Sequence, residues 1–335
     1  MTDTRQKTAA KNLPISGRGG LCGGFYGEVS RAYKKGGKIV KFYSPLRYPG
    51  GKSKLTPLIK SLMAKAGLVN ATYIEPFAGG AGVAMSLLLD GTADQVVIND
   101  LDKAVYSFWR AVKTESNALI KMIANTQITI DERSRQQTIY RTEKRYSVEL
   151  AFAALFLNRV NRSGIITGGP IGGHEQNGNW KLNARFNKEA IIDRIAEISR
   201  KKNAIVVYNQ DVITLIDNFL PKYTANAFIY FDPPYYNKAK RLYKNALTHA
   251  AHVRIANRIL DYVDCPWLLT YDDVAEIRKL YAERGIKRFD LNYSAANKGK
   301  ASEIIVCSDF SFLTSLCELN SNTIRLNLRD YEEMS

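Results

Sequence analysis

The chain has 335 residues, which is enough for two domains at roughly 150 residues each. Apolar residues make up 45% of it, an ordinary share for a globular protein, and this excludes wholesale disorder. The formal net charge of +16 favours a polyanionic partner, nucleic acid above all, although a basic surface that only aids solubility is the alternative.

The sequence also lacks several features that are typical of membrane proteins, secreted proteins and zinc-stabilised domains. No apolar run approaches the ~20 residues that cross a bilayer, and the basic N-terminus carries no apolar leader. The four cysteines are scattered without a Cys-x-x-Cys pair, so we expect neither a structural zinc site nor a disulfide framework. These observations predict a cytoplasmic protein without a membrane partner.

Residues 1–43 are predicted to be a basic, Gly-rich N-terminal extension. Six glycines crowd residues 17–27, and few apolar residues here could anchor a core, so we expect a flexible tail. The tail could contact the DNA backbone or have no function, and the sequence does not separate these alternatives.

Strands and helices alternate over most of the remaining chain. The expected strands are 72–75, 95–99, 204–208, 227–231, 267–270, 287–291 and 303–307. The expected helices are 83–89, 103–112, 212–219, 254–262 and 274–281. Such alternation predicts an α/β fold, with a mainly parallel, Rossmann-like sheet covered by helices on both faces.

Residues 116–200 interrupt this alternation. An Arg-rich helical piece is followed by an expected helix at 148–158 and by a Gly-rich stretch at 163–179. A loop of this length in a compact domain is usually functional or mobile, so we predict a mostly helical insertion that faces the substrate. The other expected parts are a catalytic domain of 44–115 and 201–325 and a C-terminal tail of 326–335.

A Gly-rich segment between an expected strand and helix favours cofactor binding. It reads Glu75-Pro76-Phe77-Ala78-Gly79-Gly80-Ala81-Gly82. Glycines let the backbone approach a ligand, and a helix N-terminus offers free N–H groups. Asp100 follows the next strand, where a carboxylate can accept hydrogen bonds from both ribose hydroxyls of an adenosine-type cofactor. A mere tight turn is the alternative, because Met85 replaces the third small residue of the dinucleotide fingerprint.

Two other patterns carry weaker signals. Gly50-Gly51-Lys52-Ser53 ends like a phosphate-binding P-loop, but Leu46 stands where that loop needs its first glycine. His249 and His252 could share a helix face, yet no third metal ligand lies nearby in the sequence. We therefore expect neither a triphosphate site nor a metal.

The sharpest chemical signal follows the expected strand 227–231. The sequence there is Phe231-Asp232-Pro233-Pro234-Tyr235-Tyr236. Two prolines remove two N–H donors and stiffen the turn, which leaves a carboxylate and outward carbonyls beside an aromatic ring. This set can accept hydrogen bonds from an amino group while it stacks a planar ring, as the exocyclic amino group of a nucleobase requires. A proline turn without function is the alternative.

These motifs occur in the same order as in the Dam-type DNA adenine-N6 methyltransferases, and the chain resembles that family from about Pro45 to Phe310. Tyr48-Pro49-Gly50-Gly51-Lys52 resembles the N-terminal cofactor motif of that family, and Glu75 to Gly82 resembles its Gly-rich cofactor loop. Asn99-Asp100 resembles the ribose-binding acid, Asp211 the acid that meets the adenine of the cofactor, and Asp232-Pro233-Pro234-Tyr235 the catalytic tetrad. The resemblance implies a class I methyltransferase fold, S-adenosyl-L-methionine as cofactor, double-stranded DNA as partner and no metal.

The resemblance also implies a mechanism. The target adenine would be flipped out of the duplex and stacked on Tyr235. The Asp232 carboxylate and the Pro233 carbonyl would accept hydrogen bonds from its amino group and direct the nitrogen lone pair toward the cofactor's methyl. Lys52 and Tyr48 would hold the cofactor, and Asp232 would contact it as well.

The insertion is implied to read the DNA. Asn158-Arg159-Val160-Asn161-Arg162-Ser163-Gly164 corresponds to the start of the family's recognition loop. Members that read GATC carry an aromatic–Asn pair where this chain has Arg162 and Ser163, and Arg162 could read a guanine edge or only a phosphate. The other expected DNA contacts are Lys181, Arg185, Asn297 and Lys298.

Several functions stay open beside the leading hypothesis of site-specific adenine-N6 methylation. The tetrad would also suit cytosine N4 or an RNA base, and a DNA-binding protein could keep the fold without catalysis. The intact tetrad argues against the last. A monomer is the default expectation, and the sequence does not reveal whether a restriction enzyme is a partner.

Overall fold

The protein was analysed as a computed structural model, which describes residues 43–47, 52–236, 247–291, 301–309 and 311. It also describes strands β1 (Tyr33–Lys35), β2 (Lys38–Val40) and β10 (Arg329–Asp330). The chain divides into two units, Met1–Lys41 and Phe42–Ser335. No described helix is long and apolar enough to cross a membrane.

The first unit was expected to be a flexible extension, and its described residues include β1 and β2, which pair in antiparallel orientation. The sequence did contain a signal for it. The two strands are separated by the dipeptide Gly36-Gly37, and Gly-Gly is a typical two-residue hairpin connection. The prediction considered only the overall glycine content and therefore missed the hairpin.

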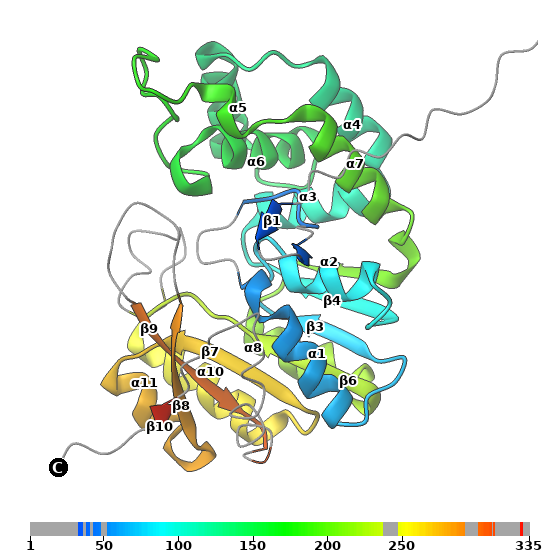
Figure 1. Cartoon of the computed structure of the whole chain (residues 1–335), viewed down its shortest axis with the longest axis vertical. Helices are drawn as coiled ribbons and strands as arrows, with labels where there is room; N and C mark the ends of the chain where they lie inside the picture. The colour runs from blue at the N-terminus through cyan, green and yellow to red at the C-terminus, as the bar shows by residue number, and fades with distance from the viewer. Residues whose placement is uncertain are drawn as a thin grey trace, which may run out of the picture. The chain divides into compact units, whose positions relative to one another are not determined.

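The second unit is built on an eight-stranded sheet with the order β10-β8-β9-β7-β6-β3-β4-β5 (Figure 1). Five consecutive strands are parallel, namely β3 (Thr72–Glu75), β4 (Gln95–Asn99), β5 (Ile205–Tyr208), β6 (Ala227–Phe231) and β7 (Trp267–Asp272). The strand β9 (Ala301–Cys307) runs antiparallel to both β7 and β8 (Ile286–Leu291). The prediction of a mainly parallel α/β sheet is therefore confirmed.

Helices cover both faces of the sheet because successive strand residues point to opposite sides. Tyr73 belongs to one buried cluster and Ile74 to the other, and Val96 and Val97 divide in the same way. The first cluster includes residues of α1 (Thr56–Lys65), α2 (Gly82–Leu89) and α3 (Lys103–Thr114). The second includes residues of α8 (Val212–Asn218), α10 (His249–Tyr262) and α11 (Ala275–Leu280).

The expected insertion contributes four helices, α4 (Ser116–Asn125), α5 (Ile130–Thr142), α6 (Val148–Val160) and α7 (Lys188–Ser199) (Figure 1). Ser147 starts α6 by accepting a hydrogen bond from the Leu150 backbone N–H at 3.0 Å. Every residue of α6 from Leu150 to Val160 is buried. Phe152 of α6 belongs to the same cluster as Trp109 of α3, so these helices and the sheet share one core.

The Gly-rich stretch after α6 has a defined conformation, which hydrogen bonds from Asn161 and from Arg133 of α5 maintain. The Asn161 side-chain amide donates to the carbonyls of Ile165 and Ile166 at 3.1 and 2.7 Å. Arg133 of α5 donates to the Asn161 amide oxygen at 2.8 Å and to the Gly168 carbonyl at 2.8 Å. A long loop was predicted here, and these side chains are what order it.

Gly164 lies at a close approach between this loop and the segment 43–47. Its φ is +77°, and a Cβ there would stand 2.1 Å from the Arg47 carbonyl oxygen. We expect Gly164→Ala to lower the free energy of unfolding by about 1–3 kcal/mol, measured by urea denaturation. The matched control is Gly169→Ala, where a Cβ meets no atom within 4 Å. Equal stability of G164A and G169A would contradict this account.

Candidate active site

The predicted cofactor and catalytic motifs meet at the carboxyl edge of the parallel strands. Strand β3 ends at Glu75, β4 ends just before Asp100, and β6 ends just before Asp232. Since β3 lies between β4 and β6, the strand order reverses at this position. Ligands of open α/β sheets bind outside the carboxyl ends of the strands at such a reversal.

The Gly-rich loop turns sharply between β3 and α2. Gly79 and Ala81 have φ values of +46° and +44°, in the left-handed region. The Ala78 N–H donates to the Asn99 carbonyl, and the Trp109 indole N–H donates to the Gly79 carbonyl, each at 2.9 Å. A Cβ on Gly82 would stand 2.3 Å from the Ser53 hydroxyl. The loop is therefore held on both sides before any ligand binds.

Asp100 fits the expected ribose-binding acid. One carboxylate oxygen accepts the Gly79 N–H and the other the Asp102 N–H, each at 2.8 Å. A carboxylate offers about four acceptor positions, so two remain for a pair of hydroxyls. Burial, followed by the nearby charge of Asp102, raises the pKa of Asp100 to about 7. The two remaining acceptor positions suit the two hydroxyls of a ribose.

Asn99 connects the Gly-rich loop to the loop that follows β5. Its side-chain amide donates to the carbonyls of Pro76 and Gln210 at 2.9 and 3.0 Å and accepts the Gln210 N–H at 2.8 Å. Asp211, the expected adenine-side acid, is exposed and caps α8 by accepting the Ile213 N–H at 2.9 Å. The two expected acids, Asp100 and Asp211, thus lie on loops that Asn99 joins.

Two side chains contact the carboxylate of Asp232, the predicted catalytic acid, and two more are linked to it through Lys52. The Lys52 ammonium is 3.2 Å from Asp232 Oδ1, and the Thr270 hydroxyl donates to the same oxygen at 2.8 Å. Lys52 lies closer to Glu303, at 2.7 Å, and the Tyr235 hydroxyl donates to the other Glu303 oxygen at 2.9 Å. Burial raises the pKa of Asp232, whereas Lys52 opposes this shift. The motifs around Lys52, Asp232 and Tyr235 therefore form one cluster.

The sequence analysis missed Glu303. It is the third residue of β9, and apolar residues follow it directly along the strand. Because β9 is antiparallel to β7, the start of β9 lies at the same edge as the carboxyl end of β7. A charged residue at the start of an otherwise apolar antiparallel strand was the available signal.

The two histidines that were considered as metal ligands contact Tyr236, in the segment that follows β6. The His249 ring nitrogen pairs with the Tyr236 hydroxyl at 3.0 Å, and the His252 ring lies against the Tyr236 ring with centroids 5.0 Å apart. The Tyr236 N–H donates to Asp272 at 2.8 Å. Among the described residues, no group of three or more side chains could hold a metal ion.

The expected DNA contacts divide into two sets. Asn158 and Arg159 are buried, and their polar groups bind backbone. Asn158 exchanges two hydrogen bonds of 2.7 Å with the Arg47 backbone, and Arg159 Nε donates to the Pro45 carbonyl at 2.7 Å. A direct DNA contact does not fit this placement, because these side chains hold the segment before Lys52. The exposed set is Arg162, Ser163, Lys181 and Arg185.

Some expected site residues lie outside the described residues. They are Tyr48, Pro49, Gly50, Gly51, Asn297 and Lys298. Their assignments therefore stay predictions.

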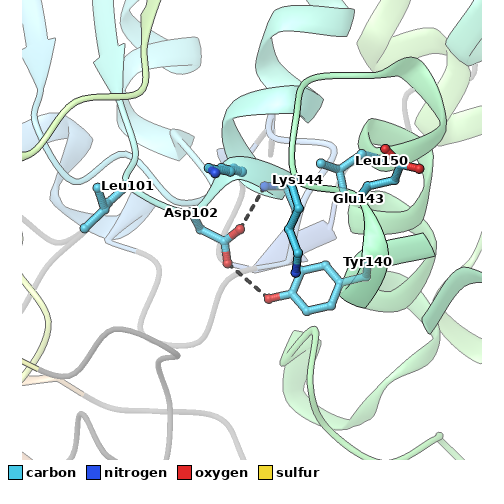
Figure 2. Close-up of a pocket in the computed structure, with 8 residues that line it drawn as sticks. Leu101, Asp102, Tyr140, Glu143, Lys144 and Leu150 are labelled. Atoms are coloured by element: carbon cyan, nitrogen blue, oxygen red, sulfur yellow. Dashed lines mark hydrogen bonds between the residues drawn. The ribbon is translucent and has the colours of Figure 1, made fainter. Parts of the chain in front are cut away.

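A cavity of about 290 Å³ lies beside the start of α3. One of its lining residues is Asp102, which follows Asp100 by two residues in the chain. Figure 2 shows Asp102 between two partners there, and its carboxylate accepts the Ala104 N–H at 2.8 Å and the Tyr140 hydroxyl at 3.2 Å. Tyr140 belongs to α5, so this contact joins the insertion to the loop that carries Asp100. The lining residues are Leu101, Asp102, Lys103, Ala104, Tyr140, Glu143, Lys144 and Leu150.

Comparison with known proteins agrees with this geometry. The family of D12 class N6 adenine-specific DNA methyltransferases matches residues 48–295, and the chain belongs to this family. It is 24% identical to the type II methyltransferase M1.LlaDCHI of Lactococcus lactis over 78% of this chain and 93% of that protein. It is 23% identical to the type II methyltransferase M.MjaIII of Methanocaldococcus jannaschii over 57% of this chain and 68% of that protein.

Among solved structures, an rRNA methyltransferase of Streptomyces viridochromogenes, AviRa, covers 78% of this chain and 86% of its own. That likeness has a TM-score of 0.34 and 14% sequence identity. The fold assignment rests on the strand order and on the family. S-adenosyl-L-methionine is the cofactor of this family, as the sequence predicted.

Glu75 generates a prediction about stability and pH. It is buried and accepts the Ala84 N–H at 2.9 Å and the Tyr73 hydroxyl at 3.1 Å, and burial raises its pKa from 4.5 to about 8. Between these values the folded protein keeps a proton that the unfolded chain releases, so the free energy of unfolding falls as the pH rises.

The variant Glu75→Gln removes this titration. We therefore expect E75Q to gain stability relative to the wild type as the pH rises through that window, by at most about 1.4 kcal/mol for each pKa unit. Urea denaturation of both proteins across the window measures the difference. A difference that stays constant with pH would contradict the assignment.

Proposed function

We propose that this chain methylates the N6 amino group of adenine at a specific sequence in double-stranded DNA, with Asp232, Pro233, Pro234 and Tyr235 as its catalytic residues. The observation that carries this proposal is the cluster of Asp232, Lys52 and Tyr235 at the sheet edge. This edge also carries Asp100 and the Gly-rich loop, so a cofactor and a planar base would meet there.

The binding of the cofactor follows from the residues on β3 and β4. S-adenosyl-L-methionine supplies an electrophilic methyl group on its sulfonium sulfur. Asp100 would accept hydrogen bonds from the ribose hydroxyls, and the backbone of residues 76–82 would lie against the remainder. Because Asn99 and Trp109 fix this loop in advance, binding would cost little ordering of the protein.

Asp232 would act on the amino group of the base. Both hydrogen bonds that the structure gives to its carboxylate, from Lys52 and Thr270, reach Oδ1. Among the described contacts, Oδ2 is therefore the oxygen left for a substrate, and the side chain is 28% exposed. With the Pro233 carbonyl as a second acceptor, the amino nitrogen would be held with its lone pair toward the methyl group.

The loop after α6 would contact the DNA through its exposed basic side chains. Arg162 Nε is held on the Pro170 carbonyl at 3.2 Å, which leaves the outer guanidinium N–H groups to face a partner in a fixed direction. A guanidinium oriented in this way suits a guanine edge. The ammonium of Lys181 and the guanidinium of Arg185 are both exposed cations, and both can bind phosphates. We propose that Arg162 reads a base and that Lys181 binds the backbone.

The catalytic assignment predicts that Asp232→Ala abolishes methyl transfer. We expect a loss of at least about 10²–10⁴-fold in kcat, because the amino group loses its charged acceptor. The dissociation constant of S-adenosyl-L-methionine, measured by calorimetry, should stay within a few-fold. Transfer of labelled methyl groups to DNA measures kcat. The same assay with RNA and with cytosine-containing oligonucleotides shows which nucleic acid and which base accept the methyl group.

The control for this experiment is Asp193→Ala, at an exposed position on α7. It should retain wild-type transfer. Activity in D232A would contradict the mechanism, and labelling of only RNA or only cytosine would contradict the substrate.

The DNA assignments predict different defects for two variants. Lys181→Ala should weaken binding equally on all sequences and reduce the salt dependence of binding by about 0.9 on a log–log plot. Arg162→Ala should instead relax the preference at one base pair, by about 1–3 kcal/mol. Binding titrations on a library of single-base variants compare the two. A uniform loss in R162A would mean that Arg162 contacts only a phosphate.

A further inference from the structure

A carboxylate that belongs to none of the recognised motifs stands at the centre of the catalytic cluster. The side chain of Glu303 is 2% exposed. One of its oxygens is 2.7 Å from the Lys52 ammonium, and the other accepts the Tyr235 hydroxyl at 2.9 Å. A single side chain therefore contacts both the N-terminal motif and the tetrad.

The sheet topology places Glu303 there. It is paired in register with Asp272 on β7 and with Phe289 on β8, so its position is fixed from both sides. Strand β7 is the neighbour of β6, which leads into the tetrad. Because the backbone of Glu303 is paired on both sides, its carboxylate cannot be displaced far if Lys52 or Tyr235 moves.

Lys52 is shared unequally between two carboxylates. Its ammonium is 0.5 Å nearer to Glu303, at 2.7 Å, than to Asp232, at 3.2 Å. A cation that binds Asp232 strongly would reduce the ability of that carboxylate to accept hydrogen bonds from the substrate amino group. The contact with Glu303 limits this effect, because it draws the ammonium toward a second carboxylate. Asp232 can then stabilise the positive charge that develops on the amino nitrogen as its new bond to the methyl carbon forms and the bond from that carbon to the sulfonium sulfur breaks.

We propose that Glu303 is a positioning residue for methyl transfer, which holds Lys52 away from Asp232 and fixes the ring of Tyr235 through its hydroxyl. The inference rests on the proposed roles of Asp232 and Tyr235. It assigns to β9 a part in the reaction that none of the family's motifs in this chain includes.

The variant Glu303→Gln removes the charge while it keeps the shape of the side chain and an acceptor for Tyr235. The contact of Lys52 with Asp232 would then no longer be opposed by a charged Glu303. We expect kcat to fall about 10–100-fold, with the KM for DNA and the dissociation constant of S-adenosyl-L-methionine within a few-fold of the wild type. The matched control is Glu276→Gln, at an exposed position on α11, which should leave kcat unchanged.

The pH profile of kcat separates this role from a merely structural one. The charge of Glu303 raises the pKa of Asp232, whereas Lys52 lowers that pKa. Without the charge of Glu303, Asp232 should lose its proton at lower pH, so the acidic limb of the pH profile of kcat should move to lower pH in E303Q. Asp232 interacts electrostatically with several ionisable groups, namely Lys52, Tyr73, Glu75, Tyr230, Tyr271 and Glu303. Of these, only Glu303 is altered in the variant.

The variant Tyr235→Phe tests the second contact without any change in charge. We expect a threefold to tenfold loss in kcat with the acidic limb unmoved. Wild-type kcat in either variant overturns the proposal, as does an unmoved acidic limb in E303Q. If E303Q does not bind the cofactor because it fails to fold, the kcat of Y235F decides.

Measuring D232A in the same series keeps this proposal separate from the proposed function. An active D232A would overturn the catalytic assignment itself. An inactive D232A together with a wild-type E303Q would overturn only the role of Glu303.

Discussion

A lysine that stays charged when it is buried needs partners that compensate for its lost hydration. Lys52 meets this requirement through Asp232 and Glu303, which come from the ends of two different strands. The pairing needs the parallel strand β6 to end where the antiparallel strand β9 begins. It also needs the segment before α1 to bring Lys52 to that edge. The proposed catalytic cluster therefore depends on contacts that three distant parts of the chain make with the Lys52 ammonium.

The insertion contributes to this meeting point although its helices were expected only to read DNA. Asn158 and Arg159 of α6 hold the backbone of Pro45 and Arg47, a few residues before Lys52. Tyr140 of α5 contacts Asp102, two residues after Asp100. Helix α6 also shares its core with α3 and the sheet. The loop proposed to bind DNA and the cluster proposed to catalyse the reaction are therefore joined by packed helices.

The parts of the fold with local signals could be predicted from the sequence. The strands β3, β4 and β6 have the predicted bounds because continuous apolar runs end at polar residues. Helix α1 was not predicted, although Pro57 near its start and the spacing of Leu58, Leu62 and Met63 are typical of a helix.

The interactions of individual site residues were harder to predict because they depend on distant segments. Asn158 lies 111 residues from its partner Arg47, and Glu303 lies 251 residues from Lys52. No local pattern shows that an arginine in a recognition motif is buried against Pro45, as Arg159 is. The motifs identified the chemistry, and the tertiary structure decided which of their side chains face the substrate.

The most direct test of the account is to sequence, with base-modification detection, the genome of a methylation-free bacterial host that expresses this chain. The account predicts N6-methyladenine at one recognition motif, and no modification in cells that express D232A at the same level. Folded wild-type protein that leaves the adenines of the host unmodified would contradict it.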